Sequence, residues 1–462
     1  MRYISTRGNA EPQSFVDSLL SGLAPDGGLF MPQSWPQLSR TQIASFKGAR
    51  YMDVAFDILS LFVGDAFADA ELRGDIEAAY ATFESTHVAP LVELGGNLFL
   101  LELFHGPTLA FKDVAMQLLG RLLARALALR ADFATIIVAT SGDTGSAAIA
   151  ALGGQRCLKL FVIHPEGRVS EVQRRQMTTS AHDNVHNIAL EGSFDDAQNI
   201  VKALFADREF SAKARLGAMN SINFARIAAQ CVYYFTAAAA FASPPVFVVP
   251  TGNFGDVFAG EAAMHMGLGI ERLVIATNSN DILWRALSEG VYSVGQPQHT
   301  LSPSMDIQVA SNFERALFEA SGRDTVWMQR AMEYFAREGY LRIPDGVLGN
   351  VRARYSAARC DDAQTIETMA GVYRETGRLI DPHTAVAVAV ARAGGGESGG
   401  PVIALSTAHP AKFPDAVRRA TGIVPPLPPR LADLYEGEER VTVLPAEVSQ
   451  VRAFVEQRLE QR

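Results

Sequence analysis

One lysine is placed where an amine could do covalent chemistry. Lys112 follows an apolar run at 98–104 and a turn at 105–108, and it falls in the first turn of a segment with helically spaced apolar residues. The positive end of a helix dipole disfavours a second positive charge there by roughly 0.3–1 kcal/mol. The position therefore favours a neutral amine, the form that attacks an aldehyde to make a Schiff base. The alternative interpretation is a solvated surface lysine beside Asp113.

A second loop, at 251–256, has the composition of an anion site. It follows an apolar run at 246–249 and opens a helical segment near Val257. Gly252 and Gly255 let the backbone turn closely, so that successive N–H groups can point at phosphate oxygens. The loop contains no lysine, which excludes a nucleoside-triphosphate P-loop. A plain strand-to-helix turn remains the alternative.

A third loop, at 140–146, is rich in hydroxyls and glycines. It follows an apolar run at 135–139 and precedes a small-residue helical segment at 147–152. Its hydroxyl and backbone donors suit a carboxylate, and its small side chains permit a flat ligand to approach. A helix start capped by Asp143 or Thr144 would explain the same composition.

The elements that must position these loops are strand-length apolar runs alternating with helical segments. Runs that are apolar throughout indicate parallel strands covered on both faces, the doubly wound α/β architecture. Ligands bind beyond the carboxyl ends of such strands. Three of the six runs lead there into small-residue loops rich in hydroxyls, amides or glycines. The six runs are 98–104, 135–139, 158–163, 246–249, 273–276 and 402–405.

Length and composition predict more than one domain. The 462 residues are 48% hydrophobic, and single cores stop growing near about 250–300 residues. Helical stretches at 52–62 and 68–83 indicate a mostly helical N-terminal region. We expect that region at 1–94, a large α/β domain at 95–130 and 240–462, and a small α/β domain inserted at 131–239.

Charge and cysteine content exclude several classes of protein. The net charge is −9 and no long run of like charge occurs, so nucleic acid is not an expected partner. No stretch reaches the roughly 20 apolar residues of a membrane span, and the cytoplasm is the expected compartment. Three scattered cysteines show no metal or disulfide spacing, and we expect them to be buried and no metal to be bound.

Beyond the three loops, short motifs along nearly the whole chain resemble those of one family. The sequence is similar to threonine synthases of the fold type II pyridoxal-phosphate enzymes, in the branch with a long N-terminal region. A single short match can arise by chance, but this many in order is a specific signal. The matching segments are 23–29, 103–108, 111–113, 139–146, 220–223, 250–256, 302–307, 311–315, 381–385 and 405–413.

The resemblance implies a pyridoxal 5'-phosphate site. Lys112 would form the Schiff base and later carry protons, and Thr407 would place its hydroxyl on the pyridine nitrogen. A hydroxyl cannot enforce a protonated ring, which suits elimination and replacement better than transamination. An ordinary strand-end hydroxyl is the alternative for Thr407. The cofactor phosphate would be held by the backbone of Gly252, Asn253, Phe254, Gly255 and Asp256.

The resemblance also implies the substrate O-phospho-L-homoserine, converted with water into L-threonine and phosphate. Ser141 and Thr144 would lie beside the cofactor ring and the amino-acid carboxylate. A phosphate dianion needs cationic and hydroxyl donors. The candidates for that role are Ser221, Asn223, Arg226, Arg315 and Lys412. Either arginine could instead be structural.

Two rival functions remain open from the sequence. Another enzyme of the same fold, a phospho-lyase or a serine or threonine dehydratase, would share the cofactor site. The N-terminal region and the segment 302–315 resemble threonine synthases more than dehydratases. A catalytically silent binding homologue is the rival from another class, but it would have no need for Lys112, the 251–256 loop and Thr407 together.

Overall fold

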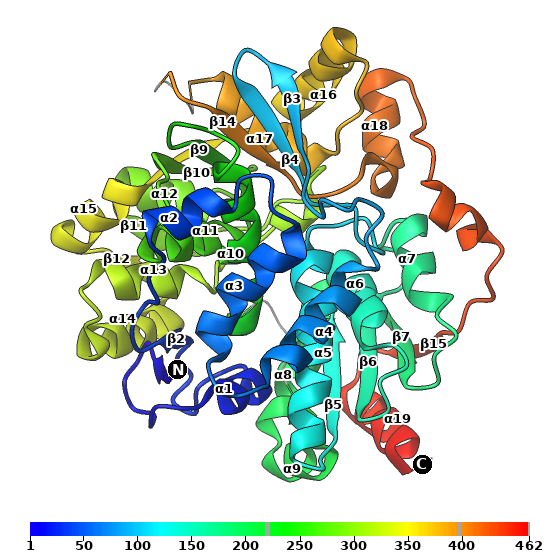
Figure 1. Cartoon of the computed structure of the whole chain (residues 1–462). Helices are drawn as coiled ribbons and strands as arrows, with labels where there is room; N and C mark the ends of the chain where they lie inside the picture. The colour runs from blue at the N-terminus through cyan, green and yellow to red at the C-terminus, as the bar shows by residue number, and fades with distance from the viewer. Residues whose placement is uncertain (218–221, 395–398, 461–462) are drawn as a thin grey trace. The chain divides into compact units, whose positions relative to one another are not determined.

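The computed structural model describes residues 1–217, 222–394 and 399–460 and divides into two compact units (Figure 1). Unit 1 comprises Met1–Leu19, Leu23–Ala115 and Ser221–Pro425. Unit 2 comprises Leu20–Gly22, Met116–Asn220 and Pro426–Arg462. Each unit contains its own sheet and its own core.

Unit 1 is built on a six-stranded sheet. Five strands run parallel, and the edge strand β3 is antiparallel to its neighbour. The order across the sheet is β13 (Tyr355–Arg359), β10 (Arg272–Thr277), β9 (Val246–Pro250), β14 (Val402–Ser406), β4 (Leu98–Glu102) and β3 (Leu91–Gly95). Two antiparallel pairs complete its strands: β1 (Tyr3–Ser5) with β2 (Phe30–Pro32), and β11 (Val291–Ser293) with β12 (Tyr340–Arg342).

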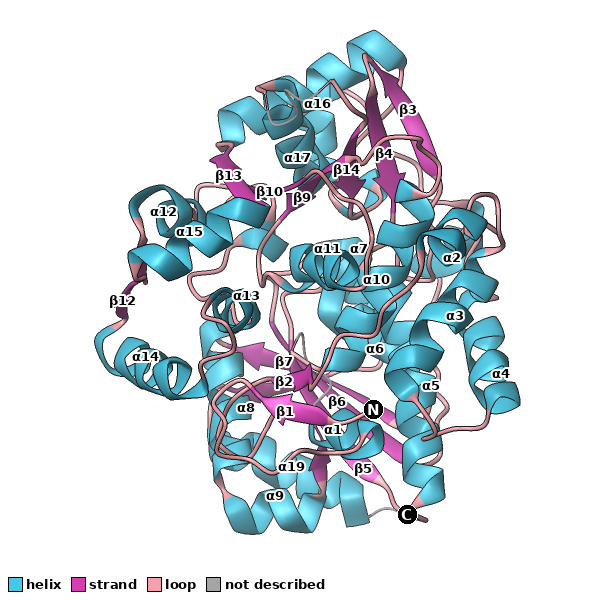
Figure 2. Ribbon diagram, turned by 60° about the vertical axis from the view of Figure 1, so that its left-hand side comes forward, coloured by secondary structure: helices cyan, strands magenta, loops and turns pink. Residues whose placement is uncertain are grey.

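Helices cover both faces of this sheet, which explains why its strands are apolar throughout (Figure 2). Val246 and Val248 of β9 pack in one core with residues of the helix Pro382–Arg392, whereas the ring of Phe247 contacts Tyr234 on the opposite face. Successive strand residues point to opposite faces, so a strand buried on both sides needs apolar residues at every position.

The helices of unit 1 come from three regions of the chain. The N-terminal region supplies α1 (Phe15–Ser21), α2 (Arg40–Ser45), α3 (Tyr51–Val63) and α4 (Asp69–Tyr80). The central region supplies α10 (Phe224–Ala238), α11 (Gly255–His265), α12 (Ile282–Glu289), η1 (Pro303–Met305), α13 (Phe313–Ala320), α14 (Thr325–Glu338) and α15 (Asp345–Arg354). The last region supplies α16 (Asp362–Thr376), α17 (Pro382–Arg392), η2 (Pro410–Lys412) and α18 (Pro414–Thr421).

Unit 2 contains a five-stranded, wholly parallel sheet. Its strand order is β15 (Thr442–Pro445), β7 (Val185–Glu191), β6 (Leu158–Pro165), β5 (Ala134–Ala139) and β8 (Leu216–Gly217). Its helices are α6 (Asp143–Leu152), α7 (Glu171–Thr178), α8 (Phe194–Ala206), α9 (Arg208–Ala214), η3 (Pro429–Tyr435) and α19 (Val448–Glu460). The helix α5 (Lys112–Leu129) begins in unit 1 and continues in unit 2.

All six apolar runs form strands, and the two parallel-rich sheets confirm the doubly wound α/β prediction. The division into units differs from the predicted domains in three respects. The inserted segment of unit 2 is Met116–Asn220 where 131–239 was predicted, so α10 belongs to unit 1. Residues 1–94 belong to the same unit as the larger sheet, with little exception. Residues from Pro426 onward belong to unit 2, because β15 pairs with β7 and Val451 and Val455 enter that unit's core.

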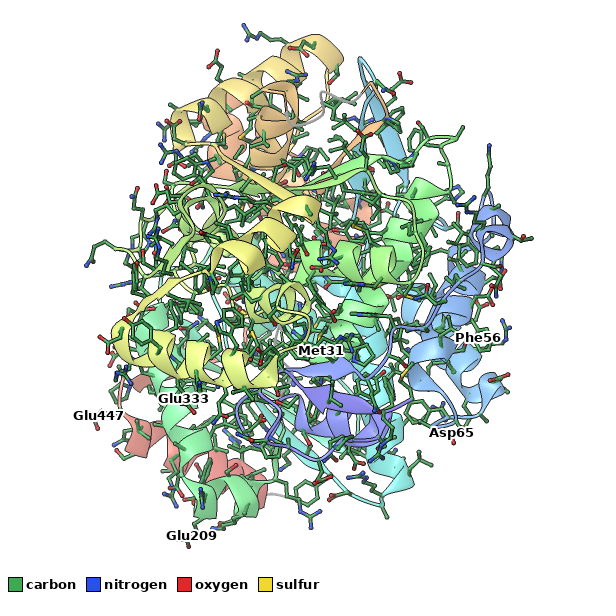
Figure 3. All side chains as sticks on the ribbon, turned by 90° about the vertical axis from the view of Figure 1, so that its left-hand side faces the viewer. Met31, Phe56, Asp65, Glu209, Glu333 and Glu447 are labelled. Carbon is green, nitrogen blue, oxygen red and sulfur yellow. The ribbon has the colours of Figure 1, made fainter. Side chains whose placement is uncertain are left out.

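Some charged side chains lie on the surface and others are buried. In unit 1, Asp65 and Glu333 are exposed, whereas Met31 of β2 is fully buried (Figure 3). The three cysteines form no disulfide, and Cys231 and Cys360 are buried while Cys157 is half-buried. In the part of the chain that the structure describes, no helix is long and apolar enough to span a membrane.

Candidate active site

Three neighbouring strands of unit 1 bring three loops to one edge of the sheet. β9, β14 and β4 are adjacent and parallel, so their carboxyl ends lie together. The segment that leads to Lys112 follows β4, Thr407 follows β14, and the loop 251–256 follows β9. This edge is where ligands bind in open α/β sheets.

The segments around Lys112 and Thr407 are joined by their backbones. The Phe111 N–H donates to the Thr407 carbonyl at 2.8 Å, and the His409 N–H donates to the Leu109 carbonyl at 3.0 Å. Thr407 is 5% exposed, and its hydroxyl makes no hydrogen bond to the described residues. A nearly buried hydroxyl thus remains available close to Lys112.

Lys112 is the first residue of α5 and is half-buried. Its neighbour Asp113 is fully buried and accepts hydrogen bonds from the Thr108 N–H at 2.8 Å and the Thr108 hydroxyl at 2.7 Å. Burial raises the pKa of Asp113, and the Lys412 charge opposes that rise. Asp113 therefore fixes the preceding turn, and the interpretation of Lys112 as one of a solvated surface pair is wrong.

Lys412, expected among the substrate-phosphate residues, is fully buried. Its Nζ donates to the Thr108 carbonyl at 2.7 Å, on the same turn that Asp113 holds. The opposite charges of Asp113 and Lys412 thus both stabilise the turn at the start of α5.

The loop 251–256 ends in an unusual helix start. Phe254, the residue before α11, has φ +67°, a left-handed conformation that is uncommon outside glycine. A Cβ on Gly252 would lie 2.8 Å from the Ser304 carbonyl oxygen, so only glycine fits against that segment. The backbone N–H groups of Gly252, Phe254, Gly255 and Asp256 donate to no residue within the described chain. This is an array of free donors at the positive end of a helix.

Arg315 supports this loop from behind. It is fully buried, and burial lowers its pKa to about 9. Its guanidinium donates to the Asn312 side chain, to the Ile222 carbonyl at 2.6 Å and to the Phe30 carbonyl at 3.3 Å. Asn312 in turn donates its backbone and side-chain N–H groups to the Asn253 carbonyl, each at 3.1 Å. Arg315 is therefore engaged by the protein itself.

Arg226 is different, because it is buried without a partner. It is 5% exposed, and its guanidinium forms no hydrogen bond or ion pair with any described residue. Burial lowers its pKa to about 10, while the Tyr233 and Asp256 charges raise it. An unpaired guanidinium costs free energy unless an anion accompanies it.

Asp256, the second residue of α11, lies near Arg226. One carboxylate oxygen accepts hydrogen bonds from the Tyr233 hydroxyl and, at 3.3 Å, from the Tyr234 hydroxyl. The other oxygen is buried with no partner in the described chain. Burial raises the pKa of Asp256 to about 7.

Two further predicted substrate residues precede α10. Asn223 caps that helix by accepting from the Ala225 N–H at 3.1 Å, and its side chain donates to the Leu19 carbonyl at 2.8 Å. These contacts are structural. Ser221 lies outside the described residues.

The predicted residues Ser141 and Thr144 belong to unit 2, with Ser141 in the turn after β5 and Thr144 in the first turn of α6. The Thr140 hydroxyl organises this loop by accepting from the Gly142 and Gly145 N–H groups, each at 2.9 Å. Asp143 is buried and accepts from the Gln173 side chain at 2.9 Å. The start of α6 is therefore held by Thr140 and not capped by Asp143 or Thr144, and the hydroxyl residues Ser141 and Thr144 are half-buried.

One contact of Lys112 was not predicted. Its Nζ donates to the Ser304 hydroxyl at 3.5 Å. The only signal in the sequence was the segment 302–307, which matched the family without a role attached.

Across residues 1–217, 222–394 and 399–460, no cluster of three His, Cys, Asp or Glu side chains could hold a metal ion.

Comparisons with known proteins agree over the whole chain. The pattern described as "Threonine synthase N terminus" matches residues 2–80, "Pyridoxal-phosphate dependent enzyme" matches 85–408, and "Threonine synthase, C-terminal" matches 384–455. A threonine synthase of Pseudomonas aeruginosa is 51% identical, with 99% of this chain and 98% of that protein covered. This chain belongs to the threonine synthase family.

Solved threonine synthases share the fold. The crystal structure of a PLP-bound threonine synthase from Brucella melitensis matches with a TM-score of 0.96 at 49% identity, covering 99% of each chain. The yeast threonine synthase matches with a TM-score of 0.94 at 37% identity, covering 100% of this chain and 99% of that one. The fold is thus the fold type II architecture of pyridoxal-phosphate enzymes, as predicted.

The residues of unit 1 fit the cofactor of the threonine synthase family. The free N–H groups at the start of α11 suit a phosphate. The half-buried Lys112 amine suits an aldehyde, and the unpartnered Thr407 hydroxyl suits a ring nitrogen. All three lie on one sheet edge, as described above.

Proposed function

We propose that this threonine synthase converts O-phospho-L-homoserine and water into L-threonine and phosphate. The observation that carries the proposal is the combination of full-length family membership with the loops of Lys112, Thr407 and 251–256 at one sheet edge. Fold alone would not separate a synthase from a lyase, but the N-terminal and C-terminal family patterns add specificity.

The cofactor would be held by residues from all three loops. The Lys112 amine would bind the aldehyde carbon, the backbone N–H groups of 252–256 would hold the phosphate, and the Thr407 hydroxyl would face the pyridine nitrogen. When bound, pyridoxal phosphate supplies an electron sink that makes loss of a proton beside the amino group possible. The neutral hydroxyl of Thr407 would moderate that sink, which suits elimination followed by addition.

Lys112 would also move protons on the substrate. The reaction needs one proton removed at the α carbon and another at the β carbon before phosphate leaves the γ carbon. Water must then add at the β carbon. An amine at the helix start can take and return protons at adjacent carbons once it is free. Water added before phosphate departs would be unproductive, so the site must exclude it until then.

Arg226 is the best-supported candidate for the substrate phosphate. Its guanidinium is buried and has no hydrogen-bond partner in the described chain, and a phosphate would provide one together with negative charge. Arg315 and Asn223 would act indirectly, since the protein already occupies most of their hydrogen-bonding groups. Ser141, Thr144 and Ser221 remain proposals from the family resemblance, with Ser141 and Thr144 on the carboxylate side of the substrate.

The test is a product assay. The purified protein is incubated with pyridoxal phosphate and O-phospho-L-homoserine, and threonine, 2-oxobutyrate and phosphate are quantified together, with Lys112→Ala as the control. Threonine equal to phosphate, and absent from the control, is expected. Phosphate with 2-oxobutyrate would instead indicate a phospho-lyase. No phosphate from a cofactor-loaded protein would show that the proposed substrate is wrong.

A further inference from the structure

The segment 381–385 matches the family but has no role in the function proposed above. Asp381 is fully buried and caps α17, accepting from the His383 and Thr384 N–H groups at 3.0 Å each. The same carboxylate lies 2.7 Å from His383 Nδ1. His383 is itself 3% exposed. Such a buried carboxylate–imidazole pair fixes the orientation of the ring.

The other ring nitrogen of His383 receives a hydrogen bond. The backbone N–H of Ser304 lies 3.2 Å from His383 Nε2. A backbone N–H is always a donor, so Nε2 must be the acceptor and carry no proton. The proton of the neutral ring is then on Nδ1 and is donated to Asp381. Asp381 fixes the ring of His383, and the ring nitrogen Nε2 in turn holds the Ser304 backbone N–H in one direction.

Ser304 connects this pair to the site. It lies in the 3-10 turn Pro303–Met305, and its hydroxyl accepts from Lys112 Nζ at 3.5 Å. The same turn packs against the loop 251–256, where a Cβ on Gly252 would meet the Ser304 carbonyl oxygen at 2.8 Å. A hydrogen bond that takes one N–H of an amine fixes its rotation and leaves the lone pair free to attack.

The rest of the segment is fixed from the other side. Asn278 donates to the Ser302 hydroxyl at 3.0 Å and to Asp306 at 2.8 Å. These contacts anchor both ends of the turn but not Ser304 itself. The His383 bond, in contrast, is made to the backbone of the central residue itself.

We propose that Asp381 and His383 are positioning residues that act through Ser304 to orient the amine of Lys112. The proposal rests on the role of Lys112 proposed above. It assigns Ser304 as a residue that touches the amine and the Asp381–His383 pair as the support behind Ser304. Outer supports of this kind commonly change reactivity by roughly 10–100-fold when they are removed.

The experiment measures how fast pyridoxal phosphate becomes attached to Lys112, trapped by borohydride reduction and quantified by peptide mass spectrometry. Ser304→Ala removes the hydroxyl. His383→Asn keeps a donor toward Asp381 but loses the acceptor for the Ser304 N–H. Each is expected to slow attachment about tenfold, and the double variant is expected to be no more than about twofold slower than either. Ser302→Ala, which removes a hydroxyl of the same segment that faces Asn278, is the matched control and is expected to match wild type.

His383→Gln provides the rescue, because its amide oxygen can reach the Ser304 N–H. It is expected to recover most of the rate lost in His383→Asn, with melting temperatures compared to exclude unfolding. Multiplying losses in the double variant, or equal losses in the Asn and Gln variants, would overturn the proposal. A wild-type protein that attaches no cofactor at Lys112 would overturn the assignment of Lys112 as well, which separates the two failures.

Discussion

At the scale of single residues, two buried arginines that looked equivalent in the sequence differ in what they contact. Arg315 donates to Asn312 and to two backbone carbonyls, whereas Arg226 has no hydrogen-bond partner among the described residues. A cation that the protein leaves unpaired at a buried position is a candidate for binding an anion. A cation that satisfies backbone carbonyls is part of the framework.

This difference predicts opposite effects of the same substitution. Arg226→Gln should raise the KM for O-phospho-L-homoserine about 10–100-fold and change the free energy of unfolding by less than about 1 kcal/mol, because a buried charge is removed together with a ligand contact. Arg315→Gln should instead lower the free energy of unfolding by about 3 kcal/mol or more, since buried acceptors lose their donor. Steady-state kinetics and urea unfolding measure both. An unchanged KM for Arg226→Gln would refute its role.

At the scale of elements, the start of α11 combines two functions. The backbone N–H groups of Gly255 and Asp256 donate to no described residue, while the Asp256 side chain accepts a hydrogen bond from the Tyr233 hydroxyl of α10. The carboxyl keeps its proton to about pH 7 in the folded chain, because burial disfavours the charge. This buried group makes the stability of the helix pair depend on pH.

The sign of that dependence follows from the two states. An unfolded chain releases the Asp256 proton above about pH 4, whereas the folded chain holds it to about pH 7, so stability falls as pH rises through this interval. Asp256→Asn cannot lose a proton and still accepts from the tyrosine hydroxyls. Its stability relative to wild type should therefore increase between pH 4 and pH 7, by on the order of 2–4 kcal/mol.

Urea unfolding of the cofactor-free protein at several pH values measures this difference. Asp65→Asn, at an exposed position, controls for the loss of one negative charge. A constant difference between Asp256→Asn and wild type across this pH range would contradict the prediction.

Strands were predicted correctly where burial on both faces requires apolar residues at every position. β9 and β14 read as continuous apolar runs because helices cover both of their sides. The edge strands β13 and β15 were not predicted, because each is partly exposed and carries polar residues or an irregular pattern. The apolar pattern of a single sequence indicates which residues are buried, but it indicates only indirectly which strands pair.

The site shows the same limit. Lys112 and the loop 251–256 could be predicted, because a residue type beside a strand end carries local information. The contact between Ser304 and His383 could not, since the two are 79 residues apart and no spacing rule connects them. Two of the guanidinium contacts of Arg315 are also remote, since Phe30 and Ile222 lie 285 and 93 residues away in the chain.

At the scale of the whole molecule, the end of the chain completes the second unit. β15 pairs with β7, and Val451 and Val455 of α19 are fully buried in the core that contains Ile188 and Leu190. From the sequence, this segment was predicted to belong to the larger domain, at 240–462. The pairing that returns it to unit 2 is long-range and leaves no local signal.

The arrangement predicts where a core defect would act. Val455→Ala should lower the stability of unit 2 by about 1–3 kcal/mol, because it leaves a cavity among buried apolar side chains. Amide hydrogen exchange should show the loss of protection in β7 and α8 before the strands of unit 1. Val448→Ala, at an exposed position of the same helix, is the control. Equal loss of protection in both units would contradict the division.

Labelling of the lysines tests most directly whether Lys112 holds the cofactor. The protein is loaded with pyridoxal phosphate, reduced with borohydride and digested, and the labelled peptide is identified by mass spectrometry. The chain has six lysines, so the label has a defined set of possible positions. Label is expected on Lys112 and not on the buried Lys412, and the Lys112→Arg variant is expected to lose the label. Stoichiometric label on another lysine, or none on a loaded protein, would contradict it.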